Sequence, residues 1–231
     1  MMSVVETGAE VEESNERLWR LIRDYMAAYA ERRPVRTVAV VGNAPLGPDV
    51  GRASKLNSSD LVIRVNSLVL DEPGAAPTVG HTCHVVLLNR STRLTPWVFQ
   101  NYRRRAYLFM QAGFTIFRTV RPPATHWPAD LGGMPVPNSI VTKRLGDLLL
   151  PGRQVNQLVP TTGMTGLFLA HEMFPDAQML ATGFSFLKDR QQQEWEHHAG
   201  GTVPVEPRHN LALEGALLES WLDDGSMEFL D

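Results

Sequence analysis

A run of β-branched and apolar residues, "RTVAVVGN" at residues 36–43, limits most strongly how this chain can fold. A continuous apolar run that stops at a glycine is typical of a buried parallel strand that enters a ligand-facing turn. Similar patterns predict further strands at Leu61 to Val65, His84 to Leu88, Tyr107 to Gln111 and Met179 to Thr182. Helical or loop patterns lie between and after them, among them Ser139 to Leu150, Thr162 to Phe174 and Asn210 to Leu222. This alternation predicts an α/β fold, a single Rossmann-like domain with a mainly parallel sheet and helices on both faces.

The N-terminal part of the chain divides into two segments. We expect residues 1–13 to be disordered and the folded domain to span residues 14–231. A helix is predicted to start at Ser14, a plausible N-cap, and to end before Pro34. Its apolar stripe, expected to cover the core, contains Leu18, Leu21, Ile22, Tyr25, Met26 and Tyr29. In contrast, the proline-rich stretch at residues 121–139 is predicted to be a long irregular loop.

Length and composition exclude several classes of protein. With 231 residues, 43% of them hydrophobic and 20% charged, the chain can bury a core without disulfides or metals. Cys83 is its only cysteine, which excludes an internal disulfide and a cysteine-based zinc site within one chain. The net charge of -3 argues against nucleic-acid binding, and the short run Arg103 to Arg105 is interpreted as solvated surface. Without a signal sequence or a membrane span, we expect a cytoplasmic protein of bacterial type. Its oligomeric state has no signal in the sequence.

Polar residues follow two of the predicted strands. Gly42 and Asn43 end the first, and "DLVIRVN" carries Arg64 within the strand and Asn66 at its end. In an open α/β sheet, ligands bind beyond the carboxyl ends of the strands. Glycine there lets a ligand approach the backbone, and an asparagine offers both a donor and an acceptor. A tight turn with a capping asparagine, and a structural ion pair for Arg64, are the alternatives.

The segment "PTTGMTGLFLAHEMF" places two hydroxyls and a glycine at the start of an apolar helix. A helix that begins at Thr161, Thr162 and Gly163 presents free N–H groups and a positive dipole end, which bind phosphate or carboxylate. The alternative is that Thr162 is only an N-cap.

Three of the seven histidines, His197, His198 and His209, fall within thirteen residues. No cluster of acidic residues accompanies them and no Asp-x-Asp motif occurs, so we expect no metal site. His209 precedes a predicted helix, and Glu214 is placed one turn into it. The alternative is that His209 caps or packs and Glu214 is solvated.

Taken in order, these segments resemble the four sialyl motifs of the sialyltransferases of glycosyltransferase family 29. The large motif is similar to "VAVVGNAPLG" through "SSDLVIRVN", and the small motif to "PTTGMTGLFLAHEMFPDAQMLATGF". "WEHHAGG" loosely resembles motif III, and His209 with Glu214 matches the His-x-x-x-x-Glu of the very small motif. Val38 stands where the family has a disulfide-forming cysteine, Ala199 where it has an aromatic residue, and the spacing from His198 to His209 is short. The Golgi anchor and stem of the family are not recognised, as in a soluble bacterial relative.

The resemblance implies a GT-A-like variant of the α/β fold that binds a CMP-activated sugar acid, sialic acid or a related ulosonic acid. Asn43 and Asn66, next to Gly42, would bind the phosphate and ribose hydroxyls of the nucleotide. Thr161, Thr162 and Gly163 would contact the nucleotide or the carboxylate of the sugar.

The resemblance also implies an inverting, metal-independent transfer that uses no cofactor besides the donor. His198 would hydrogen-bond the departing phosphate. His209 would be the general base that deprotonates the hydroxyl of a glycan or small-metabolite acceptor, with Glu214 in support. Two other functions remain open: hydrolysis of a cytidine nucleotide or CMP-sugar, and nucleotide binding without catalysis.

Overall fold

The computed structural model describes residues 8–89, 94–110, 128–138, 140–152 and 158–231. Its longer helices are α1 (Gly8–Ala28), α2 (Val50–Ser58), α4 (Val141–Leu149), α5 (Thr162–Met173) and α6 (Leu211–Asp223). Short 3-10 turns lie at Pro96–Phe99, Tyr102–Arg104 and Ser185–Leu187. The strands of the main sheet are β1 (Thr37–Val41), β2 (Leu61–Val65), β3 (Val85–Asn89), β4 (Ala106–Met110), β5 (Met134–Val136), β6 (Gln178–Thr182) and β9 (Met227–Phe229). Apart from this sheet, β7 (Glu194–Glu196) pairs antiparallel with β8 (Thr202–Pro204).

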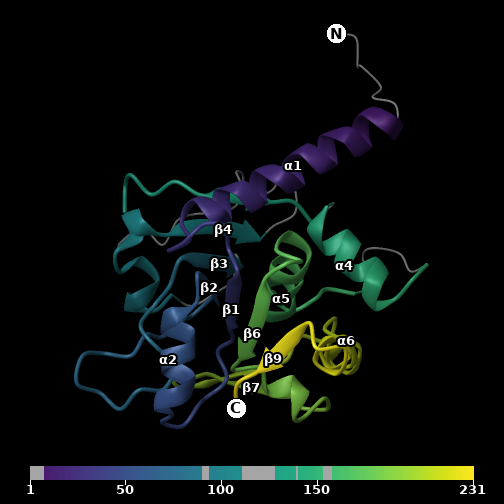
Figure 1. The fold of residues 1–231 in the computed structure, drawn as a ribbon. Coiled ribbons are helices and arrows are strands. Elements are labelled where there is room, and N and C mark those ends of the chain that lie inside the picture. Colours follow the sequence, from purple (N-terminus) through teal and green to yellow (C-terminus); the bar gives the residue numbers. More distant parts are fainter. Residues whose placement is uncertain (1–7, 90–93, 111–127, 139, 153–157) are drawn as a thin grey trace.

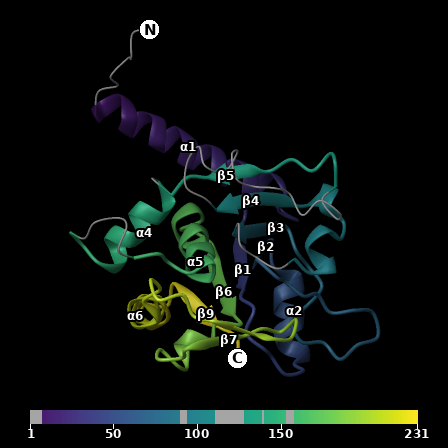
Figure 2. The same ribbon diagram turned by 180° about the vertical axis from the view of Figure 1, so that it is seen from behind.

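The strands of the main sheet are all parallel. Within the described ranges seven strands are joined in the order β5-β4-β3-β2-β1-β6-β9 (Figure 1). Helices cover both faces, with α2 on one side and α5 on the other, as the two opposite views show (Figures 1 and 2). The predicted α/β fold is therefore confirmed.

Both faces of the central strands are buried, which explains their continuous apolar sequence. On one face, Val38 and Val40 of β1 belong to the main hydrophobic core together with buried residues of α1, α4, α5 and α6. On the other face, Ala39 and Val41 pack in a second cluster with Leu56 of α2. The alternation along β1 thus divides its side chains between two cores.

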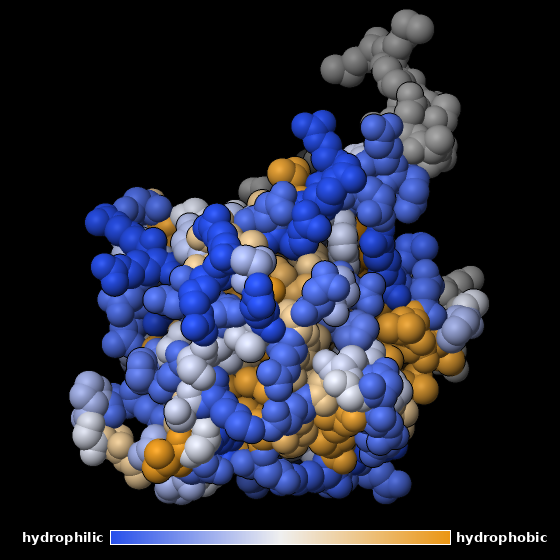
Figure 3. Space-filling model, in the orientation of Figure 1, coloured by the Kyte–Doolittle hydropathy of each residue, from blue (hydrophilic) through white to orange (hydrophobic). Residues whose placement is uncertain are grey.

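The surface seen in Figure 3 is mainly hydrophilic, with apolar residues in separate small patches.

The order of the strands identifies one edge of the sheet as the place for a ligand. From β1 the chain moves outward through β2, β3, β4 and β5, and it then returns to add β6 and β9 on the other side of β1. The direction of winding therefore reverses between β1 and β6. In open α/β sheets, ligands bind outside the carboxyl ends of the strands at such a switch point.

Helix α1 covers the main core, as predicted, but it begins earlier than the sequence indicated. Ile22 and Met26 are fully buried, and Trp19 packs edge-to-face on Phe168 of α5, with ring centroids 6.0 Å apart. Leu21, expected on the buried stripe, is 49% exposed. The predicted start at Ser14 is wrong: α1 is helical from Gly8, so residues 8–13 are helical rather than disordered, and residues 1–7 lie outside the described ranges.

Several elements were missed or misjudged from the sequence. The predicted loop at 121–139 contains β5, where Pro135 is tolerated because β5 pairs only with β4 among the described strands. The remainder of that loop at 121–127, together with Gln111 and Ser139, lies outside the described ranges. Helix α2 and strands β7, β8 and β9 were not predicted, because they are short or largely polar. No helix in the described part combines the length and apolar character of a membrane span.

Candidate active site

Two glycines meet at the carboxyl ends of β1 and β6. Gly42 donates its N–H to the carbonyl of Thr182 at 2.8 Å, and Ala44 donates to the carbonyl of Gly183 at 3.0 Å. Gly183 has a φ of 75°, which glycine adopts without strain. A Cβ on Gly42 would lie 2.2 Å from the Gly183 oxygen. Contact between two strand ends therefore requires glycine at position 42, independently of any ligand.

Asparagines lie at the ends of three neighbouring strands, all at the same edge of the sheet. Asn43 donates its side-chain N–H to the carbonyl of Val65, at the end of β2, over 3.0 Å. The side-chain oxygen of Asn66 accepts the backbone N–H of Asn89, the last residue of β3, at 2.9 Å. Asn66 itself adopts the left-handed conformation, with a φ of 47°. Asn43 and Asn66 therefore lie at adjacent strand ends, and Asn89 extends the row.

Helix α5 begins beside this row of asparagines. The amide nitrogen of Asn89 lies 3.5 Å from the Thr162 hydroxyl. The N-cap is Thr161, whose hydroxyl accepts the N–H of Met164 at 3.0 Å, so the alternative that Thr162 is the cap is wrong by one residue. Thr162 and Gly163 are partly exposed, and their N–H groups have no acceptor in the ranges that the structure describes. The start of α5 can therefore offer hydrogen bonds and a positive dipole end to an anion.

The Thr161 cap is held by a carboxylate from α6. Glu214 is fully buried and accepts the Thr161 N–H at 2.9 Å and the Thr161 hydroxyl at 2.6 Å. Burial raises the pKa of Glu214 to about 7, against the two hydrogen bonds, which lower it. The alternative of a solvated Glu214 is wrong. Because Thr161 already uses its N–H and its hydroxyl inside the protein, it positions the helix start, and we do not assign it the ligand contact that the resemblance implied.

His209 lies directly before α6 in a loop that contacts the segment leading to α5. Asn210, not His209, caps α6, since its side chain accepts the Leu213 N–H at 3.1 Å. The Nδ1 of His209 lies 2.5 Å from the carbonyl of Val159, two residues before Thr161. A carbonyl only accepts, so Nδ1 carries the proton and donates it. The neutral ring then presents an unprotonated Nε2, the form that can accept a proton from a substrate.

His198 reaches this edge of the sheet from the loop between β7 and β8, and we call the edge with its asparagines and histidines the rim. Its backbone N–H donates to the carbonyl of Asn43 at 2.7 Å. Its Nδ1 accepts the N–H of Leu46 at 3.2 Å, which places the proton of the neutral ring on Nε2. Nε2 lies 3.4 Å from the hydroxyl of Thr78, a long contact. Burial lowers the pKa of His198 below its usual value, so the neutral form is favoured.

Behind Thr78, an aspartate binds a whole turn of backbone. Asp71 accepts the Thr78 hydroxyl at 2.6 Å and the N–H groups of Thr78, Val79 and Gly80 at 2.8, 3.1 and 2.7 Å. Burial alone would raise the pKa of Asp71, but these hydrogen bonds hold it below the usual value. The contacts from Asp71 to Thr78 and from Thr78 to His198 fix the imidazole beside the end of β1. Asp71 and Thr78 carry no strand-end signal in the sequence, so the sequence did not predict them.

Arg64 is buried in a cage of carbonyls rather than in an ion pair. Its guanidinium donates to Thr82 at 2.8 Å, to Val69 at 3.2 Å, and to Val79 and Gly80 at 2.6 and 3.3 Å. Burial lowers its pKa to about 10, so it stays charged at neutral pH. The expected structural ion pair is therefore replaced by backbone acceptors, which fix the loop that supplies Thr78.

The arginine triplet also departs from expectation in one residue. Arg103 pairs with Asp130 at 2.7 Å and Arg104 is exposed, but Arg105 is buried and donates to the carbonyl of Trp97. Only two of the three residues therefore lie at the surface.

Within the part of the chain that is described, no group of three or more His, Cys, Asp or Glu side chains is arranged to hold a metal ion.

Two rim residues missed from the sequence had a usable signal. The run "VVLLN" repeats the pattern of an apolar strand followed by asparagine that had drawn attention to Asn66, so Asn89 could have been found. Phe184 follows Gly183, and a Cβ on Gly163 would lie 2.9 Å from its ring. The "GF" pair after β6 thus explains the glycines at both 42 and 163.

These features define a Rossmann-like α/β domain with a polar rim at its topological switch point. No protein-family model matches the sequence, and no curated protein matches it at a significant level. Among solved structures, a mammalian sialyltransferase has a similar fold, with a TM-score of 0.56 and 15% identity over 94% of this chain and 85% of its own. The structure of a mammalian sialyltransferase in complex with Gal-beta-1-3GalNAc-ortho-nitrophenol aligns with a TM-score of 0.53 and 16% identity, again over 94% of this chain and 85% of its own. The chain therefore has the fold of the sialyltransferases, as the resemblance of its motifs implied.

Proposed function

We propose that this protein is a glycosyltransferase that transfers a sugar acid from a CMP-activated donor to an acceptor hydroxyl, with inversion and without a metal. The proposal is supported by three independent features: the fold shared with solved sialyltransferases, the order of the four sequence motifs, and the convergence of the motif residues at one edge of the sheet.

The observation that carries the proposal is the orientation of His209. Its Nδ1–H bonds to the carbonyl of Val159, in the segment that leads into α5, and this leaves Nε2 as a proton acceptor. A general base needs an unprotonated nitrogen within reach of the hydroxyl that it deprotonates. The start of α5 offers the N–H groups of Thr162 and Gly163 to the phosphate or carboxylate of the donor. Base and donor site would then lie side by side.

The asparagine row suits the nucleotide. Because the amide nitrogen of Asn43 is already bonded to Val65, its side-chain oxygen remains as an acceptor, which matches a ribose hydroxyl better than a phosphate. Asn66, fixed in the left-handed conformation, would contact the nucleotide beside it. We extend this assignment to Asn89, which continues the row toward Thr162.

Charge develops on the departing phosphate and on the sugar ring during such a transfer. A nucleotide monophosphate is a good leaving group. Hydrogen-bond donors that are already oriented toward the developing charge should therefore account for much of the rate enhancement. Among the described residues, the Nε2–H of His198 makes only the long contact to Thr78, and it would exchange this contact for a hydrogen bond to the phosphate. Glu214 would act through Thr161 as a positioning residue, because both of its oxygens bind that residue.

The acceptor class follows only from the fold. The mammalian structure in complex with Gal-beta-1-3GalNAc-ortho-nitrophenol holds a glycoside, and we therefore propose a glycan or a small hydroxylated metabolite as acceptor. We retain the cytoplasmic location and the bacterial type of the protein as predictions from the sequence.

Calorimetry combined with product analysis tests the proposal. We expect CMP to bind more tightly than AMP, and Asn66→Ala to weaken CMP binding about tenfold, as expected for the loss of roughly 1.4 kcal/mol of polar contact. Incubation with CMP-sialic acid and a glycoside should give a new glycoside together with CMP. Release of free sugar acid regardless of acceptor would identify a hydrolase. CMP binding without turnover would identify a binding module, and tighter binding of AMP would overturn the nucleotide assignment.

A further inference from the structure

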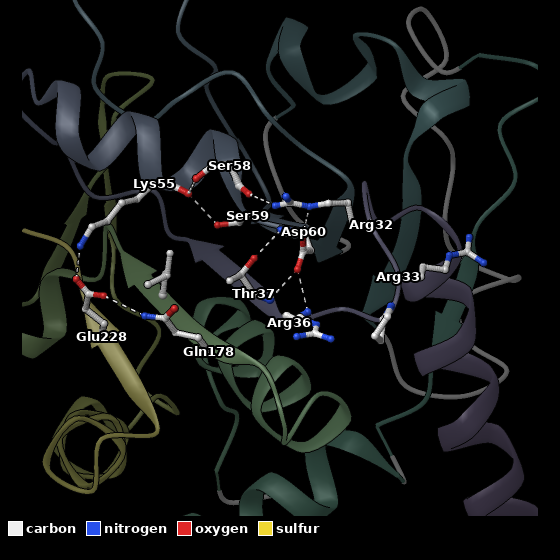
Figure 4. Close-up of a pocket in the computed structure, with 12 residues that line it drawn as sticks. Arg32, Arg33, Arg36, Thr37, Lys55, Ser58, Ser59, Asp60, Gln178 and Glu228 are labelled. Carbon is white, nitrogen blue, oxygen red and sulfur yellow. Dashed lines mark hydrogen bonds and ion pairs between the residues drawn. The ribbon is translucent and has the colours of Figure 1, made fainter.

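A cavity of about 680 Å³ lies at the opposite edge of the sheet from the candidate active site. Thr37 and Gln178, the first residues of β1 and β6, line it, so it opens at the amino ends of the strands (Figure 4). The cavity shares no lining residue with the rim of asparagines and histidines. Parallel sheets place their usual ligands at the other edge, so the proposed transferase function does not account for this cavity.

One carboxylate of the cavity is already saturated. Asp60 accepts the Nε of Arg32 at 2.6 Å and the backbone N–H groups of Arg36 and Thr37 at 2.9 and 3.0 Å. Burial alone would raise the pKa of Asp60, but these hydrogen bonds keep it below its usual value, so Asp60 is ionised at neutral pH. Its charge is thus used by Arg32 and by the backbone, and the Arg36 side chain is not part of the arrangement.

The second carboxylate is paired as well. Glu228 accepts Lys55 at 2.5 Å at the other end of the cavity, where Figure 4 shows both beside Gln178. The Arg33 guanidinium extends away from these groups and donates to the Ala28 carbonyl. In the described part of the chain, the Arg36 guanidinium has no hydrogen-bonding or ionic partner. Four cationic side chains line the cavity against two carboxylates, an excess of two positive charges, and Arg33 contributes to this excess although its guanidinium points away from the carboxylates.

We propose that this cavity binds a phosphate monoester as its dianion. The phosphate would lie between the Arg36 guanidinium, which offers paired N–H donors to phosphate oxygens, and Nη1 of Arg32. The other two nitrogens of Arg32 donate to Asp60 at 2.6 Å and to the carbonyl of Ser58 at 2.9 Å. Two negative charges match the excess positive charge of the lining. Leu180, the apolar aliphatic residue of the lining, would pack against the organic part of the ligand. A carboxylate would neutralise only half of the charge and is therefore the poorer match.

Binding of ribose 5-phosphate, measured by calorimetry at constant ionic strength, tests the proposal with Arg36→Met as the main variant. The backbone N–H of residue 36, which binds Asp60, remains in this variant, so the fold should persist. We expect the affinity to fall at least about tenfold, the loss of one charged hydrogen-bonded contact. Arg36→Lys, which keeps the charge but not the fork, should retain part of the affinity. Arg104→Met, an exposed arginine away from the cavity, is the matched control and should bind as the wild type does.

The outcomes separate this site from the transferase site. CMP is itself a phosphate monoester, so an Asn66→Ala variant is measured with ribose 5-phosphate as well. Affinity lost in Arg36→Met but kept in Asn66→Ala supports the amino-edge site, even if CMP-sugar turnover is never found. Inorganic phosphate that binds as tightly as ribose 5-phosphate would show that the phosphate alone is recognised. The proposal is overturned if the wild type does not bind ribose 5-phosphate, if Arg36→Met binds it unchanged, or if Arg104→Met loses as much affinity.

Discussion

The two edges of the central sheet are built from different chemistry. At the carboxyl edge, the exposed groups are amides, hydroxyls, free N–H groups and imidazoles. The ionisable groups Glu214, Arg64 and Asp71 are held behind them by hydrogen bonds to the main chain or to Thr161 and Thr78. At the amino edge, guanidinium and carboxylate groups face the cavity directly (Figure 4). The first arrangement holds neutral donors and acceptors in fixed positions, which suits a reaction in which charge develops. The second suits recognition of a charge that is already present.

The largest effect should come from removing the proposed base, His209, at the carboxyl edge. His209→Ala is expected to lower turnover of CMP-sialic acid by about 10²- to 10⁴-fold, the usual contribution of a general base. CMP affinity should change little, because the proposed role of Nε2 is to deprotonate the acceptor hydroxyl and not to bind the nucleotide. Steady-state rates measured together with calorimetry check both statements.

His81→Ala is the matched control for that prediction, because His81 is an exposed histidine outside both edges. A His209→Ala enzyme with wild-type turnover would remove the base assignment. Equal losses in His81→Ala and His209→Ala would indicate a general loss of folded protein.

The next effect concerns the buried carboxylate behind the carboxyl edge. The pKa of Glu214 is raised from 4.5 to about 7 by burial, so the folded state binds more protons than the unfolded state between these values. The free energy of unfolding should therefore fall as the pH rises from about 4.5 to 7, by roughly 3 kcal/mol at most. Urea denaturation at several pH values measures this, and Glu214→Gln should flatten the dependence.

Two comparisons sharpen this result. Glu194→Gln, at an exposed position in β7, should leave the pH dependence unchanged. Asp60, at the amino edge, has a lowered pKa, so its contribution has the opposite sign: it is present above the usual pKa of an aspartate and is lost as the pH falls. A Glu214→Gln protein that keeps the full slope would contradict the assignment of the slope to that carboxyl.

A smaller effect is expected from the glycine contact between β1 and β6. Gly42→Ala places a methyl group against the Gly183 carbonyl, which must move, and overpacking of this kind costs about 1–3 kcal/mol of stability. Thermal and urea denaturation measure the loss. CMP affinity should fall with it, while ribose 5-phosphate should bind as before if the two edges are independent.

Gly47→Ala is the control, because a Cβ at Gly47 meets no atom within 4 Å. It should change the stability by less than about 0.5 kcal/mol. Equal destabilisation by the two substitutions would show that the contact with Gly183 is not the cause.

Much of the fold was predictable because its signals are local. The apolar runs of β1, β2, β3, β4 and β6 are buried on both faces, so hydrophobicity alone located them within about two residues. Short elements with polar or mixed sequences, such as α2 and β9, were missed because tertiary packing and not their own pattern stabilises them. The start of α1 was misplaced because the acidic segment before Ser14 shows no apolar stripe.

The candidate site was predicted in outline and corrected in detail. Asn43, Asn66 and the start of α5 were expected at one edge because parallel strands end together, and the structure places them there. The partner of Thr161 was not predictable, since Glu214 is 53 residues away and meets it only through the packing of α6. The same holds for His198, whose ring is oriented by Leu46 and Thr78 from distant segments.

The sequence by itself determined which segments become buried strands and that amides, hydroxyls and imidazoles follow them, because side-chain period and backbone preference act over a few residues. The tertiary structure alone decided which of these groups are already bonded, which tautomer His209 adopts, and that Arg32 and Arg36 meet Lys55 and Glu228 around one cavity. Those properties depend on neighbours far apart in the chain, whose distances are set only when the sheet is assembled.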